Sequence, residues 1–315
     1  MRPRVHLGST GLLFLLCLLL LLAQGLVQPN FLTYAQVINL LKIAAVLGIL
    51  TIGQTLVVLS GQEGVDLSIG AVATFGAVLV YNFSQGKNES FPIALGLALM
   101  AGLSLGSLNG VLVAYSRLPP LVATLGVGTL VQGLIVWLGG RERGAIPPIL
   151  VDLVSTPWIL GLPGILFLWI LLALSVTWLL RRTYYGKALY ALGSNRRAAY
   201  LSGIRPERYL IWTYALSGFF SALGGAILLG HVQVMHLTLG QAYTLPTVVA
   251  VVAGGTLLTG GVGSYWGSMA GALLITLLQS VLLTLRIEEF GRQIAFGVIL
   301  LGLLAVYGRE KGLRQ

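Results

Sequence analysis

Few residues of this chain could do chemistry, and they form no catalytic or metal-binding pattern. The 315 residues include nine acidic residues, three histidines and one cysteine. Cys17 lies in an apolar run, and a lone thiol forms neither an internal disulfide nor a cysteine metal cluster. His6, His231 and His236 are scattered along the sequence. We therefore expect no enzymatic activity, no metal and no cofactor bound by this chain.

The segment 61–70, GQEGVDLSIG, places Glu63 and Asp66 between two apolar runs. A carboxylate within hydrocarbon is costly, so it should be paired, at a boundary or functional. In the simpler interpretation, this is a cytoplasmic loop in which Asp66 or Ser68 caps the following helix. In the alternative, Asp66 and Ser68 lie near the cytoplasmic end of a translocation pathway. A proton relay is disfavoured because no expected span has an ionisable group at its centre.

The composition is typical of a polytopic membrane protein. Hydrophobic residues make up 57% of the chain and charged residues only 9%, against about 25% in soluble domains. The 42 glycines favour close helix packing in lipid. The net charge of +10 is explained by topology and contact with anionic membrane lipid, so we expect no nucleic-acid partner.

Ten apolar runs predict an all-α fold of about ten transmembrane helices, forming a single domain over residues 1–315. The first run also resembles a secretory signal peptide, although a retained helix is the simpler account. The eighth run contains Pro246 and ends in GGTLLTGGVGS, which predicts a broken, Gly-rich span. The runs are 11–27, 37–60, 68–83, 92–115, 121–139, 164–180, 209–230, 245–260, 265–285 and 291–307.

The distribution of Lys and Arg predicts the orientation. With ten spans, both termini share one side, which holds about 13 basic residues against 6 on the other. The larger group comprises Arg2, Arg4, Arg117, Arg181, Arg182, Lys187, Arg196, Arg197, Arg205, Arg208, Arg309, Lys311 and Arg314; the smaller comprises Lys42, Lys87, Arg141, Arg143, Arg286 and Arg292. The positive-inside rule then places both termini in the cytoplasm.

Polar residues within the expected spans are uncharged, so no ring of charge predicts an ion-selective pore. Amides and hydroxyls of this kind either join helices or line a passage for a neutral polyhydroxylated solute. Our candidate pathway residues are Gln54, Asp66, Ser68, Asn109 and Thr124.

The longest basic interruption is the stretch at about 185–208, YGKALYALGSNRRAAYLSGIRPER. Ser194 or Asn195 could cap a short helix from Arg196 to Leu201, which Gly203 would end. A lipid-facing basic loop is the simpler interpretation, but the small residues suggest a surface that docks into a partner. The sequence lacks a GxxxxGK[ST] loop, so this chain is not expected to hydrolyse ATP.

Five segments, in order, resemble permease subunits of ATP-binding cassette (ABC) importers of the ribose/monosaccharide branch, a branched-chain-type family. They are LSGQEGVDLSIGAVATFGA, RLPPLVATLG, GKALYALGSNRRAAYLSGI, YALSGFFSALGGAIL and VVAGGTLLTGGVGSYWGSMAGALL. The resemblance implies a permease in the bacterial cytoplasmic (inner) membrane, paired with a second copy or a paralogue. It further implies ABC ATPase subunits that use the ATP, and an extracytoplasmic sugar-binding protein.

The same resemblance implies that the loop 186–205 couples the permease to the ATPase. The residues it points to are Gly186, Ala191, Gly193, Ser194, Asn195, Ala198, Ala199, Leu201, Ser202 and Gly203. The implied cargo is a neutral monosaccharide: a ribose-like pentose, a hexose or a related furanosyl compound. A nucleoside permease is the alternative within the family, and a self-contained secondary carrier is the alternative outside it.

Overall fold

The computed structural model describes residues 7–28, 31–61, 64–116, 118–139, 144–159 and 161–312. Glu63, Arg2, Arg4, Arg117, Arg141, Arg143 and Arg314, which the sequence analysis used, lie outside the described residues. The helices are α1 (Leu7–Val27), α2 (Tyr34–Leu59), α3 (Ile69–Ser84), α4 (Phe91–Tyr115), α5 (Pro120–Gly139), α6 (Pro148–Ser155), α7 (Gly164–Arg182), α8 (Tyr184–Ser194), α9 (Arg196–Leu201), α10 (Pro206–Val232), α11 (Thr244–Ala253), α12 (Tyr265–Thr284) and α13 (Glu289–Gly312). The strands β1 (Pro157–Ile159) and β2 (Leu162–Pro163) form a small antiparallel hairpin.

A helix occupies each of the ten apolar runs, in agreement with an all-α polytopic membrane protein. Among the described residues, six helices are long and apolar enough to cross a membrane: α2, α4, α5, α7, α10 and α12. Three further apolar segments are shorter, at Thr10–Leu26, Ile69–Ser84 and Gln241–Ala253. The count of ten crossings therefore stays a prediction.

The eighth apolar run is helical over only part of its expected length. Helix α11 has 10 residues and ends at Ala253, where residues 254–264 continue as irregular backbone. An α-helix rises 1.5 Å per residue, so α11 spans about 15 Å, or half a hydrocarbon core. Gly255, Gly260 and Gly261 have positive φ angles of 83°, 86° and 72°, which side chains with a Cβ rarely adopt.

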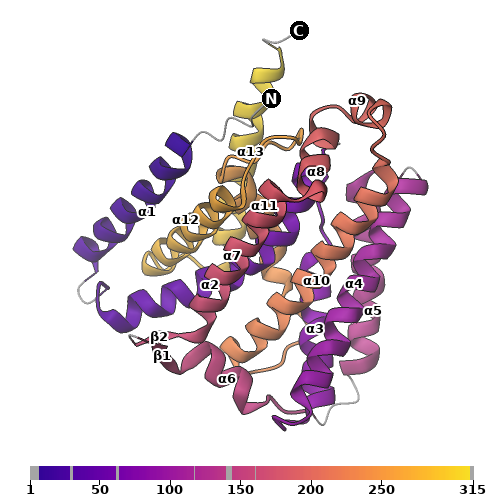
Figure 1. The fold of residues 1–315 in the computed structure, drawn as a ribbon. Helices are drawn as coiled ribbons and strands as arrows, with labels where there is room; N and C mark the ends of the chain where they lie inside the picture. The colour runs from indigo at the N-terminus through magenta and orange to yellow at the C-terminus, as the bar shows by residue number, and fades with distance from the viewer. Residues whose placement is uncertain are drawn as a thin grey trace.

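Helices α2 and α10 form the centre of the bundle (Figure 1). In their most apolar windows, 83% of the α2 residues and 72% of the α10 residues are buried, against 22% for α4 and 28% for α5. Helices α4 and α5 accordingly lie at one edge, and α1 lies at the opposite edge against α12. Gln24 of α1 donates to Ser280 Oγ of α12 at 2.9 Å, which gives the first helix a fixed place in the bundle.

Glycines bring α4 and α10 into close contact. Gly102, Gly106 and Gly110 recur every fourth residue and therefore lie on one face of α4. A Cβ at Gly106 would meet the backbone of Tyr214, and one at Gly102 would meet the backbone of Gly218. Such small residues let backbones approach closely, which drives helix association in lipid.

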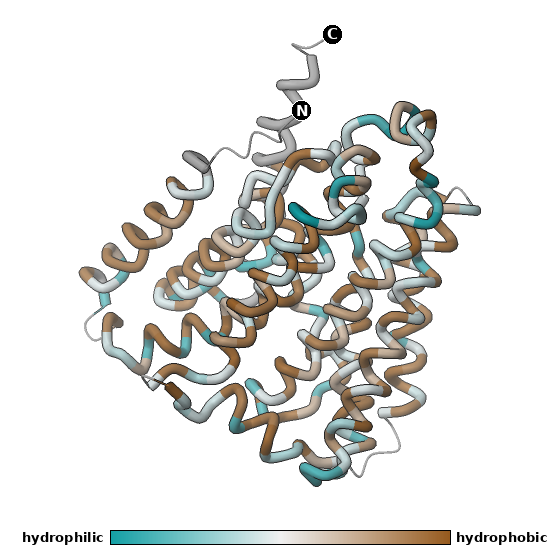
Figure 2. The backbone as a smooth tube through the Cα atoms, in the orientation of Figure 1, coloured by the Kyte–Doolittle hydropathy of each residue, from teal (hydrophilic) through white to brown (hydrophobic). Residues whose placement is uncertain are grey.

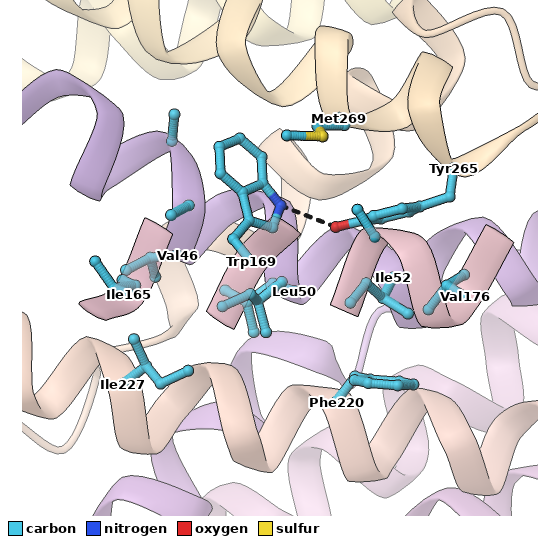
Figure 3. Packing of buried hydrophobic residues seen from close by; sticks show 14 of the residues in the cluster. Val46, Leu50, Ile52, Ile165, Trp169, Val176, Phe220, Ile227, Tyr265 and Met269 are labelled. Carbon is cyan, nitrogen blue, oxygen red and sulfur yellow. Dashed lines mark hydrogen bonds between the residues drawn. The ribbon is translucent and has the colours of Figure 1, made fainter. Parts of the chain in front are cut away.

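An aromatic pair ties α2, α7 and α12 together within the largest hydrophobic cluster (Figure 3). Trp169 Nε1 donates to Tyr265 Oη at 3.0 Å, and Tyr265 Oη donates to the Gly48 carbonyl at 2.8 Å. Both polar atoms are therefore satisfied in an apolar interior, which keeps the burial of these large rings favourable.

The two ends of the bundle differ. Helices α8 and α9 lie at one end, and α6 with the β1–β2 hairpin lies at the other (Figure 1). Helix α1 begins and α13 ends toward the α8–α9 end. Hydrophilic positions gather near α9 and at the opposite end, while apolar positions dominate between them (Figure 2). This pattern is typical of a bundle whose middle lies in hydrocarbon.

Candidate functional site

Helices α8 and α9 form the candidate coupling element, and local signals build both. Asn195 accepts a hydrogen bond from Ala198 N at 3.0 Å and so caps α9, which ends at Leu201 before Gly203 at φ 87°. The short helix predicted from the sequence is confirmed, with its caps. Helix α8 was not foreseen, although Thr183 accepts from Gly186 N at 3.3 Å in the manner of an N-cap.

The coupling element exposes basic side chains and, at the end of α9, an apolar tip formed by Tyr200 and Leu201. Tyr200 and Leu201 are 62% and 78% exposed, and Arg197, Arg205 and Arg208 are also exposed. Arg196 lies 3.8 Å from Glu207, which joins α9 to the start of α10. Among the predicted coupling residues, Ser194, Asn195, Ala198, Leu201, Ser202 and Gly203 are exposed, so they are available to a partner.

A groove of about 670 Å³ separates α9 from the hairpin between α4 and α5. Arg196 and Glu207 line one wall, and Leu118, Pro119 and Pro120 line the other. The coupling element and this hairpin therefore lie on opposite sides of one groove.

The small residues of α8 face inward, which corrects the expectation that they form a docking surface. Gly186 of α8 is buried, as is Ala199 of α9, and a Cβ at Gly186 would meet the carbonyls of Leu179 and Leu180. At Gly193, a Cβ would meet the Leu59 carbonyl and the backbone of Gly261. The absence of side chains here permits close contact within the chain.

Three glycines meet where α8 contacts the rest of the chain. Gly61 follows α2, Gly193 belongs to α8, and Gly260 belongs to the irregular segment after α11, and their backbones lie in direct contact. Gly261 N also donates to the Leu59 carbonyl at 3.1 Å. A displacement of α8 would therefore act directly on the end of α2 and on the irregular segment.

Two tyrosines anchor α8 to its neighbours. Tyr190 Oη donates to the Gly263 carbonyl at 2.9 Å, and Tyr185 Oη lies 2.8 Å from Thr213 Oγ1 of α10. Burial raises the pKa of the Tyr185 phenol, and the bond to Thr213 only partly opposes this rise. Burial also raises the pKa of Tyr190, opposed by Arg181. Both phenols thus stay protonated and keep their donors near neutral pH.

Asp66 is the centre of a buried polar network in the connection between α2 and α3. Its Oδ1 accepts from Ser68 N at 2.9 Å and from Ser68 Oγ at 2.6 Å, and its Oδ2 accepts from Ser217 Oγ of α10 at 2.7 Å. Asn109 of α4 donates to Ser68 Oγ at 2.9 Å, and Leu67 N donates to Thr124 Oγ1 of α5 at 3.1 Å. The network thus fastens this connection to three further helices.

The capping expectation for this motif is wrong in its details. Ser68 occupies the N-cap position of α3 but makes no side-chain cap bond; its hydroxyl donates to Asp66 and accepts from Asn109. Asp66 is 1% exposed, so it lies inside the protein and not on a solvated loop. Burial raises the pKa of its carboxyl group, and the bonds from Ser68 and Ser217 oppose that rise.

The five predicted pathway residues are closed off from solvent in this conformation. Asp66, Ser68, Asn109 and Thr124 share the network, and all five are at most 1% exposed. Gln54 is fully buried, and neither atom of its amide has a hydrogen-bond partner. That this buried amide lacks a partner among the described residues was not readable from the sequence, and the pathway role of all five residues stays a prediction.

Among the residues that the structure describes, no group of three or more His, Cys, Asp or Glu side chains could hold a metal ion. The polar groups of the site that the structure describes are the buried network around Asp66 and the exposed side chains of α8 and α9.

Comparison with known proteins defines the class. The model of a family described as "Branched-chain amino acid transport system / permease component" matches residues 36–306. The chain belongs to this family of permease components, which confirms the resemblance found in its motifs.

Individual proteins of known name are similar to the chain over most of its length. The chain is 33% identical over 315 residues to the "Autoinducer 2 import system permease protein LsrC" of Yersinia pestis (strain Pestoides F), covering 98% of this chain and 88% of the relative. It is 33% identical over 302 residues to the protein of that name from Salmonella typhi, covering 96% and 85%. No solved structure matches the chain significantly.

Proposed function

We propose that the chain is the membrane-spanning permease subunit of an ATP-driven importer for a neutral, sugar-like solute. The observation that carries this proposal is the full-length similarity to importer permeases, together with an exposed element at one end of the bundle. The sequence has no nucleotide-binding loop, so ATP is used by a separate ABC ATPase, and this chain binds no cofactor itself.

In this proposal, the ATPase contacts α9 and moves α8. The apolar tip at Tyr200 and Leu201 fills a cleft in the ATPase, and the basic residues around it fix its orientation. The glycine junction at Gly61, Gly193 and Gly260 then transmits the displacement to the connection that holds Asp66. Direct backbone contacts suit this role because they have no flexible side chains to absorb the movement.

The remaining components of the importer are proposed from the family of permease components to which the chain belongs. A second permease, either an identical copy or a paralogue, completes the pathway, and an extracytoplasmic binding protein delivers the solute. The chain lies in the bacterial inner membrane as a single domain with both termini in the cytoplasm. The names of its relatives make autoinducer 2 the first solute to test, with ribose as the second.

Uptake by cells tests this function. We expect cells that express the chain together with a partner ABC ATPase and an extracytoplasmic binding protein to accumulate labelled autoinducer 2 or ribose. Omitting the ATPase, or disabling its nucleotide site, should reduce accumulation to that of empty cells. Accumulation that persists without the ATPase would contradict the importer and favour a self-contained carrier.

Topology gives a second prediction. In a Cys17→Ser chain, the variant Arg197→Cys should react with a membrane-impermeant maleimide only after the cells are permeabilised, because the basic excess places α9 in the cytoplasm. The variant Trp158→Cys, at the opposite end on β1, should react in intact cells. Reaction of Arg197→Cys in intact cells would overturn the orientation.

A further inference from the structure

A groove lined by both apolar and polar residues lies between the first half of α2 and the second half of α12, away from the coupling element and from the Asp66 network. Its volume is about 210 Å³. It is lined by Phe31, Gln36, Asn39, Leu40, Ile43, Thr276, Gln279, Ser280 and Leu283. The proposed topology places these helix ends at the extracytoplasmic side, opposite α9.

Three side-chain amides in this groove have unused hydrogen-bonding capacity. Gln36 and Asn39 are exposed and Gln279 is half-buried, and none of the three bonds to another residue that the structure describes. Each amide has two donors and one acceptor oxygen. Hydrocarbon would leave these groups unpaired at considerable cost, so lipid is a poor occupant.

Two hydroxyl groups in the groove also have unused hydrogen-bonding capacity. Ser280 Oγ accepts from Gln24, which leaves its own proton free to donate, and Thr276 donates to the Ala272 carbonyl, which leaves its oxygen free to accept. The buried Leu40 and Phe31 provide an apolar floor beneath these polar groups. No Asp, Glu, Lys, Arg or His lines the groove, so nothing in it compensates the charge of an ion.

We propose that this groove binds the transported solute as it enters from the extracytoplasmic side, and that the solute is an uncharged, polyhydroxylated molecule. Its hydroxyls exchange hydrogen bonds with water for bonds with the three amides and with Ser280, while its carbon faces lie against Leu40 and Phe31. This inference rests on the proposed importer function and assigns the residues that recognise its solute.

Accessibility tests the groove independently of cargo. In a Cys17→Ser chain, Asn39→Cys and Gln279→Cys should react in intact cells with a cationic, membrane-impermeant methanethiosulfonate reagent. Leu97→Cys is the depth-matched control, because Leu97 is an exposed apolar residue near the corresponding end of α4. It should stay unreacted in lipid. Failure of both groove variants to react, or equal reaction of the control, would overturn the proposal.

Transport tests recognition, with autoinducer 2 and ribose as the probes. Asn39→Leu and Gln279→Leu should each reduce uptake at least tenfold with unchanged amounts of chain in the membrane. Ser175→Leu should transport normally, since Ser175 is exposed on α7 and bonds only to Leu171 of its own helix. Equal uptake by all variants would overturn solute binding here.

The accessibility test and the transport test together distinguish failure of the groove proposal from failure of the proposed function. In one outcome, the groove variants react with the reagent while the unsubstituted chain transports neither autoinducer 2 nor ribose. That result would contradict the proposed function or its solute, and it would leave the accessibility of the groove standing. If the groove thiols do not react and two copies of the Asn39→Cys chain form a disulfide with each other, the groove is a subunit interface. That result would overturn the proposal.

Discussion

Replacing Leu201 by aspartate is expected to abolish solute uptake while the chain remains folded and inserted. Leu201 is 78% exposed at the end of α9, so its side chain contributes little to the bundle itself. Burying a leucine in a partner contributes about 1.5–3 kcal/mol, and an unpaired carboxylate there adds a penalty. Since 1.4 kcal/mol is a factor of ten, the ATPase should bind roughly 100-fold more weakly.

Co-purification of the ATPase and uptake of solute measure this effect side by side. Leu201→Met is the matched control, because it keeps an apolar side chain of similar volume and should retain both activities. Gly193 is unsuitable for the same purpose, since any side chain there would strike the backbone of Leu59 and Gly261. Normal ATPase binding by Leu201→Asp would show that the tip of α9 does not carry the contact.

Replacing Asp66 by alanine is expected to destabilise the chain by about 3 kcal/mol or more. The substitution removes the acceptor for three donors, Ser68 N, Ser68 Oγ and Ser217 Oγ, all in a solvent-free interior. Each buried donor left unpaired costs about 1–3 kcal/mol. Thermal unfolding of the detergent-solubilised chain should show a midpoint lowered by about 6 °C or more.

Two variants define the comparison for Asp66. Asp66→Asn keeps one acceptor oxygen and can donate to Ser217, so it should lose less stability than the alanine variant. Asp152→Ala removes an exposed carboxylate of α6 that accepts only from Thr156, and it should change stability by less than about 0.5 kcal/mol. An Asp66→Ala chain as stable as the Asp152→Ala chain would show that the network is not needed for folding.

The two variants are expected to fail in different ways because they affect opposite ends of one chain of contacts. In our proposal Leu201 contacts the ATPase, whereas Asp66 holds the connection that begins at Gly61. Between them lies the junction of Gly61, Gly193 and Gly260. A variant at the tip should leave a stable but uncoupled permease, and a variant in the network should leave an unstable one.

The sequence by itself determined the class of protein, the approximate positions of the helices in the ten apolar runs, and the short helix α9. These features depend on local information. A run of about 20 apolar residues implies a helix in lipid, whatever the rest of the chain does. Asn195 and Gly203 likewise act on backbone groups within a few residues of themselves, so their effects could be read directly.

Only the tertiary structure decided which face of each helix is used. The sequence could not show that Gly193 contacts the end of α2, and we had therefore placed its surface against a partner. Asp66 was assigned to a loop because its partner Ser217 lies 151 residues away. The groove between α2 and α12 was likewise invisible, since its amides come from segments about 240 residues apart. Local propensity acts over a few residues, whereas these contacts depend on how distant helices pack.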